Sequence, residues 1–204
     1  MGLYSRLIFP RLLDLTMSGR ELSDYRQTLL KSVMGDVLEI GFGTGLNLPY
    51  YSDQVTTLTA IDPNEGMAAI AKKRLDASPI EVKLQTASAE TLPMAANSFD
   101  AVVCTWTLCS IPNIHQALEE VHRVLKPGGR FLFIEHGLSP DRNLGQWQRR
   151  ITPLQRRIAD GCHLDRPIAS LVQDVFGQVD WEEFYAKELP KLIGYFYKGM
   201  AIKQ

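Results

Sequence analysis

Three glycines at alternate positions follow a short apolar stretch in "VLEIGFGTGLN", which runs from Val37 to Asn47. Aliphatic residues of this kind predict a buried strand, and glycines at its end let a ligand approach the backbone closely. The spacing is Gly41-x-Gly43-x-Gly45, whereas a loop that holds a dinucleotide pyrophosphate reads G-x-G-x-x-G. The loop therefore predicts a cofactor site that departs from the dinucleotide pattern.

Two carboxylates accompany this loop. Glu39 stands two residues before Gly41, and Asp62 ends the next predicted strand in "LTAIDPN". An ionised carboxylate accepts hydrogen bonds through two oxygens, so Asp62 could bind both hydroxyls of a ribose. Glu39 would repel a pyrophosphate but would suit a cationic amino-acid group. S-adenosylmethionine carries an ammonium and a sulfonium and no phosphate, so these residues favour it over NAD.

His136 is the candidate proton acceptor, since it follows Glu135 at the expected carboxyl end of a strand. The ordinary pKa of histidine, about 6.5, suits proton transfer near neutrality. The alternative is a structural histidine that ties Glu135 to a loop. His163 in "DGCHLDR" is the second candidate. Methyl transfer from a sulfonium is an in-line displacement, so positioning and exclusion of water matter more than a strong base.

The three cysteines, Cys104, Cys109 and Cys162, are too few for a disulfide scaffold and favour a reducing, cytoplasmic location. Cys109 and Cys162 raise the question of a zinc site with His136 and His163. No C-x-x-C or H-x-x-x-H pair supports one, so we expect no metal. Cys109 could contact a methyl acceptor or simply pack in the interior.

Large aromatic residues and one charged pair offer further candidates around the acceptor. Trp106 and Trp147 could wall the acceptor pocket or lie in the core. Asp160 and Arg166 flank Cys162 and could form an ion pair that fixes their loop.

Strands and helices alternate along the chain, which is typical of a parallel sheet covered on both faces. "SGRE", Ser18 to Glu21, fits a capping box that starts a helix ending near Lys31. The expected strands are 37–40, 57–61, 80–85, 99–104, 130–135, 178–185 and 191–202, and the expected later helices are 64–75, 113–125, 142–158 and 166–173. Ligands of such sheets bind at the carboxyl ends of the strands.

Length and charge limit the classes of protein to which the chain can belong. With 204 residues, 45% of them hydrophobic, the chain can bury one sizeable core. A formal net charge of −1 gives no basic field, so nucleic acid is not expected as a partner. The apolar residues of "LYSRLIFPRLLDLTM" are interrupted by three charged residues and one proline, so we expect neither a membrane span nor a signal peptide there.

Four motifs in order, "VLEIGFGTGLN", "IDPN", "ASAETLPMAANSFDAVVC" and "EEVHRVLKPGGRF", resemble the class I S-adenosylmethionine-dependent methyltransferases of the type 11 group, over roughly residues 35–135. The resemblance implies an α/β, Rossmann-like fold with a seven-stranded, mostly parallel sheet, helices on both faces and an antiparallel final strand. It implies S-adenosylmethionine as the cofactor. It also implies that the glycines pass under the methionine part and that Asp62 holds the ribose.

By the same resemblance Pro63, Asn64 and Met67 border the adenine, and Ala89 with Glu90 lies near its amino edge. Met67 could equally pack within its helix. Many relatives have Asp where Ser88 stands, which leaves the adenine contact to Ser88 or to backbone. The candidate catalytic residue is His136, and the candidate cofactor-binding residues are Glu39, Gly41, Gly43, Gly45, Asn47, Asp62, Pro63, Asn64, Met67, Ser88, Ala89, Glu90, Cys104 and Thr105.

A narrower resemblance covers nearly the whole chain. "VVCTWTLCSIPN", "EHG", "WQ" followed by "TP", and "DGCHLDR" are similar to a bacterial subgroup related to the membrane-associated thiol S-methyltransferases. This implies methyl transfer to a small, fairly apolar acceptor, with a thiol favoured. The alternatives are N-methylation of phosphatidylethanolamine, which the lack of a polybasic patch weakens, and a protein that binds the cofactor without turnover.

The N-terminal segment has two possible roles. Leu3, Tyr4, Leu7, Ile8, Leu12 and Leu13 form an apolar stripe beside Arg6 and Arg11. Such a stripe could lie in a membrane interface, which would make the protein peripheral to a membrane, or it could cap the active site. We favour a helical lid over residues 1–34 that forms one globular unit with a methyltransferase domain over 35–204. The sequence does not predict an oligomeric state.

Overall fold

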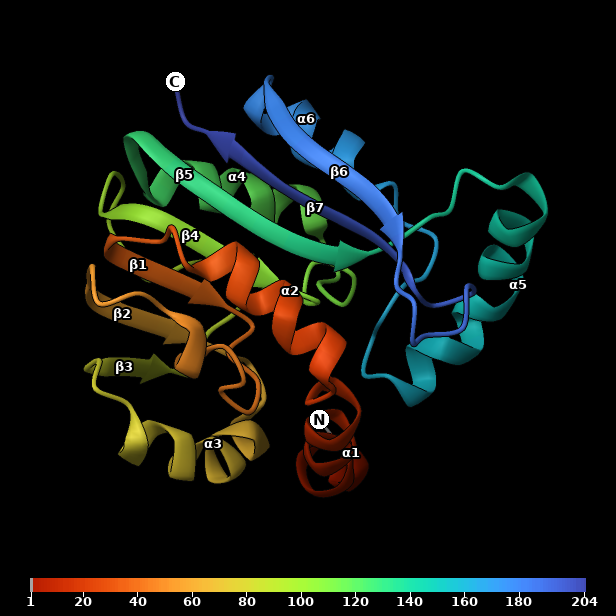
Figure 1. Ribbon diagram of the computed structural model, residues 1–204, viewed down its shortest axis with the longest axis horizontal. Coiled ribbons are helices and arrows are strands. Elements are labelled where there is room, and N and C mark those ends of the chain that lie inside the picture. Colours follow the sequence, from red (N-terminus) through yellow and green to blue (C-terminus); the bar gives the residue numbers. More distant parts are fainter. Residues whose placement is uncertain (1) are drawn as a thin grey trace.

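The computed structural model describes residues 2–204 and contains one seven-stranded sheet in the order β3-β2-β1-β4-β5-β7-β6. Strands β1 to β5 pair in parallel, while β7 runs antiparallel to both β5 and β6 (Figure 1). The predicted sheet with its antiparallel final strand is confirmed. The strands are β1 Gly35–Ile40, β2 Val55–Ile61, β3 Val82–Gln85, β4 Phe99–Thr105, β5 Leu125–His136, β6 Val179–Tyr185 and β7 Tyr195–Ile202.

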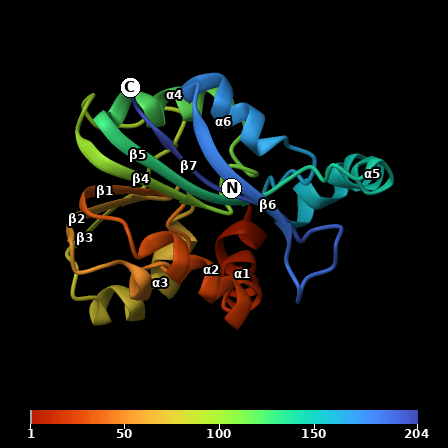
Figure 2. The same ribbon diagram turned by 45° about the horizontal axis from the view of Figure 1, so that its top comes forward.

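Helices cover both faces of this sheet. In Figure 2, α1, α2 and α3 lie on one side of the strands, α4 and α6 lie on the other, and α5 stands off to one side. Among the described residues, no helix is long and apolar enough to cross a membrane. The helices are α1 Phe9–Met17, α2 Arg20–Leu30, α3 Glu65–Ala77, α4 Ile114–Val124, α5 Arg142–Ile158 and α6 Ile168–Phe176, with a π-helical turn Tyr4–Ile8 and a 3-10 turn Leu48–Tyr50.

Successive residues of each strand point to opposite faces, which divides the core in two. In β1, Leu38 and Ile40 pack with α4 and α6, whereas Val37 packs with α2 and α3. Helix α4 buries one stripe, Ile114, Ala117, Leu118, Val121 and Val124, against the first of these faces. Because both faces are covered, the central strands are nearly continuous apolar runs.

The predicted capping box at the start of α2 is wrong. The Ser18 hydroxyl donates to the carbonyl of Leu15 at the end of α1, and no side chain caps the N-terminus of α2. The Glu21 carboxylate instead accepts backbone N–H bonds from Lys187 and Glu188, at 2.7 and 2.8 Å. Ser18 lies between two consecutive helices, and Glu21 has a partner more than 160 residues away, which no local pattern reveals.

Candidate functional site

A cavity of about 760 Å³ opens at the carboxyl ends of the central strands. Gly41 and Gly43 line it after β1, Asp62 after β2, Thr105 at the end of β4, and His136 at the end of β5. This is the edge of an open parallel sheet at which ligands bind. The lining therefore brings together residues that are far apart in the sequence.

The glycine loop is tightly packed against the chain that follows β4. Gly41 has a φ of 75°, and a Cβ at this position would overlap the side chain of Thr107. The Asp62 carboxylate accepts the Gly43 N–H at 2.8 Å through one oxygen and the Asn64 N–H at 2.8 Å through the other. Burial raises the pKa of Asp62, although these two bonds oppose the rise. Each oxygen keeps accepting capacity for a further donor.

Glu39 lies behind the cavity wall rather than in it. Its side chain is 1% exposed and accepts hydrogen bonds from the Asn47 amide at 2.9 Å and the Tyr51 hydroxyl at 2.7 Å. Burial raises the pKa of Glu39 to about 7. The Asn47 amide also donates to the Thr105 hydroxyl at 3.0 Å. Glu39 thus fixes Asn47, which does line the cavity.

One polar atom beside the glycine loop lacks a partner. The side-chain oxygen of Asn47 is buried and accepts no hydrogen bond from residues 2–204. Arg26 also lines this end, with its guanidinium 4.7 Å above the ring of Trp106, and burial lowers its pKa to about 10. An unsatisfied acceptor and a cation in the wall of one cavity suit the ammonium and the carboxylate of an amino-acid group.

The start of α3 and the turn that contains Ser88 and Glu90 form a further, polar part of the cavity wall. Asn64 caps α3 by accepting the Gly66 N–H at 3.0 Å. The Ser88 hydroxyl bonds the Glu90 carboxylate at 3.0 Å, and Glu90 in turn accepts the Asn113 N–H at 2.7 Å. Ser88 and Glu90 therefore hold each other in a fixed turn at the cavity wall.

Most of the sequence-predicted residues meet at this cavity, but three do not. Glu39, Gly45 and Cys104 are absent from its lining. Gly45 is a turn residue with a φ of 78°, and Phe42 and Leu48 pack around it. Cys104 is fully buried on the opposite face of β4 from Thr105, with its thiol 3.5 Å from a Glu135 oxygen. The predicted residues in the lining are Gly41, Gly43, Asn47, Asp62, Pro63, Asn64, Met67, Ser88, Ala89, Glu90, Thr105 and His136.

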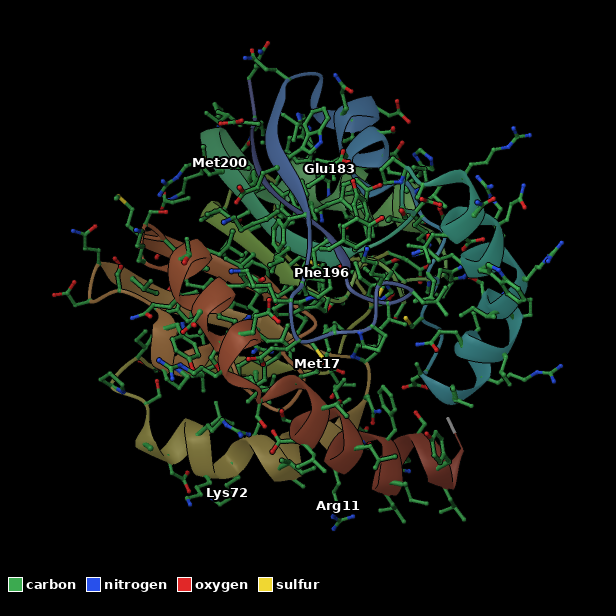
Figure 3. All side chains as sticks on the ribbon, turned by 45° about the vertical axis from the view of Figure 1, so that its right-hand side comes forward. Arg11, Met17, Lys72, Glu183, Phe196 and Met200 are labelled. Atoms are coloured by element: carbon green, nitrogen blue, oxygen red, sulfur yellow. The ribbon has the colours of Figure 1, made fainter. Side chains whose placement is uncertain are left out.

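The N-terminal segment forms part of the cavity wall. Phe9, Leu13, Thr16 and Met17 belong to its lining. In Figure 3, Met17 and Phe196 are labelled near the centre of the view, whereas Arg11 points away from the body of the molecule.

Polar contacts hold this segment on both sides of the cavity. Asn64 donates to the Ser5 carbonyl at 2.8 Å, and Asp14 pairs with Arg74 at 2.7 Å. Ser5 also donates to the Asp160 carboxylate at 2.9 Å, and the Tyr4 hydroxyl donates to the Ile158 carbonyl at 2.8 Å. The segment therefore bridges the start of α3 and the end of α5.

Two sulfurs and an imidazole gather in one part of the cavity wall, contributed by the segment after β4, the end of β5 and the segment after α5. Cys109, His136 and Cys162 all line the cavity. The His136 Nε2 atom lies 3.0 Å from the Cys162 sulfur, which also receives a bond from Gln155 at 3.7 Å. Hydrogen bonds from Cys109 and His136 lower the pKa of Cys162 against the effect of burial. Burial favours neutral His136, but Cys162 and Glu135 outweigh it and raise its pKa.

The structure distinguishes between the alternatives that the sequence left open for this part of the cavity. Trp106 lines the cavity, but Trp147 on α5 is 56% exposed and does not. Asp160 and Arg166 form no ion pair in the described part of the chain, because Arg166 donates to the carbonyls of Leu108 and Ile111 instead. His163, the second candidate base, lies beside Asp165 and outside the cavity lining.

Comparisons with known proteins agree with this geometry. Residues 38–133 match the family described as a methyltransferase domain. A thiol S-methyltransferase of Rattus norvegicus is 34% identical over 183 residues, which cover 85% of this chain and 74% of that protein. A second thiol S-methyltransferase, from Homo sapiens, is 36% identical over 64% of this chain and 54% of its own length.

Solved structures share the fold at lower identity. An S-adenosylmethionine-dependent methyltransferase of Thermotoga maritima has a TM-score of 0.68 and 22% identity, with 98% of each chain covered. A phosphoethanolamine N-methyltransferase of Haemonchus contortus, solved with S-adenosylhomocysteine, has a TM-score of 0.69 and 15% identity, over 97% of this chain and 61% of that one. At these identities the likeness concerns the fold alone.

Proposed function

Because the chain belongs to the S-adenosylmethionine-dependent methyltransferases, we propose that it transfers a methyl group to the sulfur of a small, fairly apolar thiol. The observation that carries this proposal is the end of the cavity at which Cys109, His136 and Cys162 meet among apolar side chains. The similar proteins named thiol S-methyltransferases support the same acceptor class. The apolar residues of the cavity include Phe9, Leu13, Met17, Leu164, Leu189, Ile193 and Phe196.

Bound S-adenosylmethionine supplies the methyl group as an electrophilic sulfonium. We propose that Asp62 accepts the ribose hydroxyls with the oxygens that already fix the glycine loop. Asn47 offers its unsatisfied oxygen to the ammonium, and Arg26 offers its charge to the carboxylate. Glu39 acts by holding Asn47 in place. The adenine then lies against Pro63, Asn64, Met67, Ser88, Ala89 and Glu90.

A thiol must lose its proton to become a good nucleophile, and its ordinary pKa is about 8.5. We propose that His136 acts at the acceptor end of the cavity, together with the two neighbouring sulfurs, to favour the thiolate. The in-line displacement itself needs alignment of the acceptor sulfur with the methyl carbon in a dry cavity. The apolar walls and the cover formed by α1 exclude water.

Residues 1–34 are proposed to act as the lid of this cavity, and residues 35–204 as the methyltransferase domain. The contacts of Ser5 with Asn64 and Asp160 support this division, because they fasten the segment across the opening. A lid that opens would admit both ligands, and closing would remove water before reaction.

A second acceptor class, the amine of a phosphatidylethanolamine headgroup, is favoured by one observation. Leu3, Leu7 and Ile8 on the outer face of the lid are more than half exposed, as are Leu154 and Ile158 on α5. Helix α5 also carries five arginines and no acidic residue. Such a surface suits an anionic membrane interface, from which a lipid acceptor would enter.

The two classes are distinguished by offering labelled methyl donor with separate small thiols, amines and phenols, and with phosphatidylethanolamine vesicles. The proposal expects labelled methyl thioethers from apolar thiols. Label transferred only to the lipid or to amines would overturn it in favour of N-methylation. Tight binding of S-adenosylhomocysteine with no transfer to any acceptor would identify a protein that binds the cofactor without turnover.

A further inference from the structure

Cys109, His136 and Cys162 come from three separate segments. Cys109 follows β4, His136 ends β5, and Cys162 follows α5. Each offers one ligand atom, and these three atoms are buried and lie within 4.8 Å of one another. Both cysteines are free thiols. Two thiols and an imidazole are the side chains that zinc prefers in proteins.

The distances suit one tetrahedral ion. Bonds of about 2.3 Å to sulfur and about 2.0 Å to nitrogen place ligand atoms roughly 3.5 to 3.8 Å apart. The His136 Nε2 and Cys162 Sγ atoms are 3.0 Å apart without an ion, and no pair exceeds 4.8 Å. Shifts of about 1 Å or less would therefore complete the geometry, which side-chain rotation can supply.

The two loops that carry the cysteines are held together by other bonds. The His163 N–H donates to the Cys109 carbonyl at 2.9 Å, and Arg166 donates to the Ile111 carbonyl at 2.7 Å. Donors also face the sulfurs, since Gln155 lies 3.7 Å from the Cys162 sulfur and the Ser110 hydroxyl lies 3.6 Å from the Cys109 sulfur. Bonds of this kind orient metal ligands and tune them.

The cluster is incomplete in two respects. The His136 Nδ1 atom is buried and has no hydrogen-bond partner within residues 2–204. The cluster also supplies three ligands where a closed structural zinc site has four. Since all three residues line the cavity, the missing position lies on the cavity side. Three protein ligands with one open position are the arrangement of catalytic zinc sites.

We propose that Cys109, His136 and Cys162 bind one zinc ion whose fourth position opens into the cavity and takes the sulfur of the acceptor thiol. The part played by the fourth position rests on the proposed function, whereas the metal site itself does not. His136 then promotes the reaction as a ligand of the ion. Two thiolates balance the charge of the ion, which suits its enclosed position.

Coordination explains how the acceptor is both deprotonated and aligned. When the thiol sulfur binds the ion, its proton passes to water and leaves the cavity. A bond then forms between that sulfur and the methyl carbon. The bond from carbon to the sulfonium breaks, and its electron pair stays on the leaving sulfur. The net change converts a thiol and S-adenosylmethionine into a methyl thioether, S-adenosylhomocysteine and one proton. The neutral thioether is a weaker ligand and leaves.

The test measures metal in the full chain, prepared without a histidine tag and with a phosphine reductant in place of a thiol. We expect about one zinc per chain by elemental analysis, and the same amount after removal with a chelator and return of zinc sulfate. Cys109→Ser and Cys162→Ser should each lower zinc affinity by about tenfold or more. His163→Ala is the matched control, because it alters a neighbouring histidine outside the cavity, and it should retain zinc.

Cobalt(II) gives a readout that does not depend on activity. The cobalt-loaded chain should show sulfur-to-cobalt charge-transfer absorption that weakens in either cysteine variant, and a small thiol should change its visible bands. Variants are compared only where calorimetry shows that they still bind S-adenosylhomocysteine. If neither variant folds, the spectrum of the unaltered chain decides. No zinc, no sulfur-to-cobalt absorption, or a disulfide between Cys109 and Cys162 in the isolated chain would overturn the metal site.

The metal site and the proposed function fail separately. A metal-free chain that methylates thiols would overturn the zinc proposal and leave the function standing. A zinc-bound chain that methylates only amines would overturn the thiol acceptor and the role of the fourth position, while the metal site would stand.

Discussion

Substitution of Gly66 by alanine tests whether the N-terminal segment is the lid of the cavity. Gly66 is the second residue of α3, where the π-helical turn Tyr4–Ile8 passes directly over it. A Cβ at this position would overlap the carbonyl oxygen of Arg6 and lie 2.9 Å from its carbon. Carbon atoms in contact are about 3.5–4.0 Å apart, so the turn must move by about 1 Å.

This movement would break the contacts that fasten the lid to α3. The bond from Asn64 to the Ser5 carbonyl, now 2.8 Å, contributes about 1 kcal/mol. The ion pair between Arg6 and Glu65 is more than half exposed on both sides and contributes a few tenths at most. Closure of the lid should therefore become less favourable by about 1–1.5 kcal/mol. If the closed form binds the cofactor, affinity should fall by roughly fivefold to tenfold.

Calorimetry with S-adenosylhomocysteine and limited proteolysis of the first 34 residues measure this effect. The Gly66→Ala variant should bind S-adenosylhomocysteine more weakly, and the protease should cut it faster within the first 34 residues. Gly19→Ala is the control, because nothing lies within 4 Å of a Cβ there, and it should leave both unchanged. Alanine stabilises helix positions relative to glycine by about 0.5–1 kcal/mol. A Gly66→Ala variant that is simply more stable, with unchanged affinity and proteolysis, would refute the lid.

Three further predictions concern the cavity. Asp62→Ala should weaken S-adenosylhomocysteine binding by about a hundredfold, because charge-assisted bonds to the loop and ribose are lost; calorimetry that shows less than a threefold change would contradict this. Burial raises the pKa of Glu39 from 4.5 to about 7, so folding favours the protonated carboxyl group. The contribution of this group to the free energy of unfolding is therefore fully present below pH 4.5 and is lost as the pH rises to 7. Between pH 4.5 and 7 the free energy of unfolding, measured with urea, should therefore fall by about 3 kcal/mol more in the wild type than in Glu39→Gln. Equal decreases in the two proteins would exclude the raised pKa of Glu39. His136→Ala should lower kcat/KM for a thiol by about a hundredfold below the pKa of that free thiol and by much less above it, and steady-state assays across pH that find no change would make His136 structural.

The fold could be predicted because its signals are local. The alternation of apolar strands with helices such as α4, whose buried stripe recurs at helical spacing, determines a doubly wound sheet. The capping box failed because Ser18 serves the end of α1 and Glu21 serves a distant loop. Local patterns report which elements form, and they do not report which partners reach a given side chain.

The candidate site could be predicted only in part, because the sequence does not show which way each side chain points or which distant segments meet. Cys104 and Thr105 are consecutive in β4, so they point to opposite faces and only Thr105 lines the cavity. Glu39 follows the same alternation and is turned toward Tyr51 and Asn47. The proximity of Cys109, His136 and Cys162 could not be predicted, because the three residues come from three separate segments. Spacing rules such as C-x-x-C detect ligands from one segment only.

The most direct test of the central claim is identification of the methylated product. The purified chain is incubated with S-adenosylmethionine that carries a deuterated methyl group and with an equimolar mixture of a small apolar thiol and its amine analogue, followed by mass spectrometry. The proposed function predicts a deuterated methyl thioether that forms in equal amount with S-adenosylhomocysteine, and no methylated amine. A deuterated methylamine product with the thiol unchanged would contradict it.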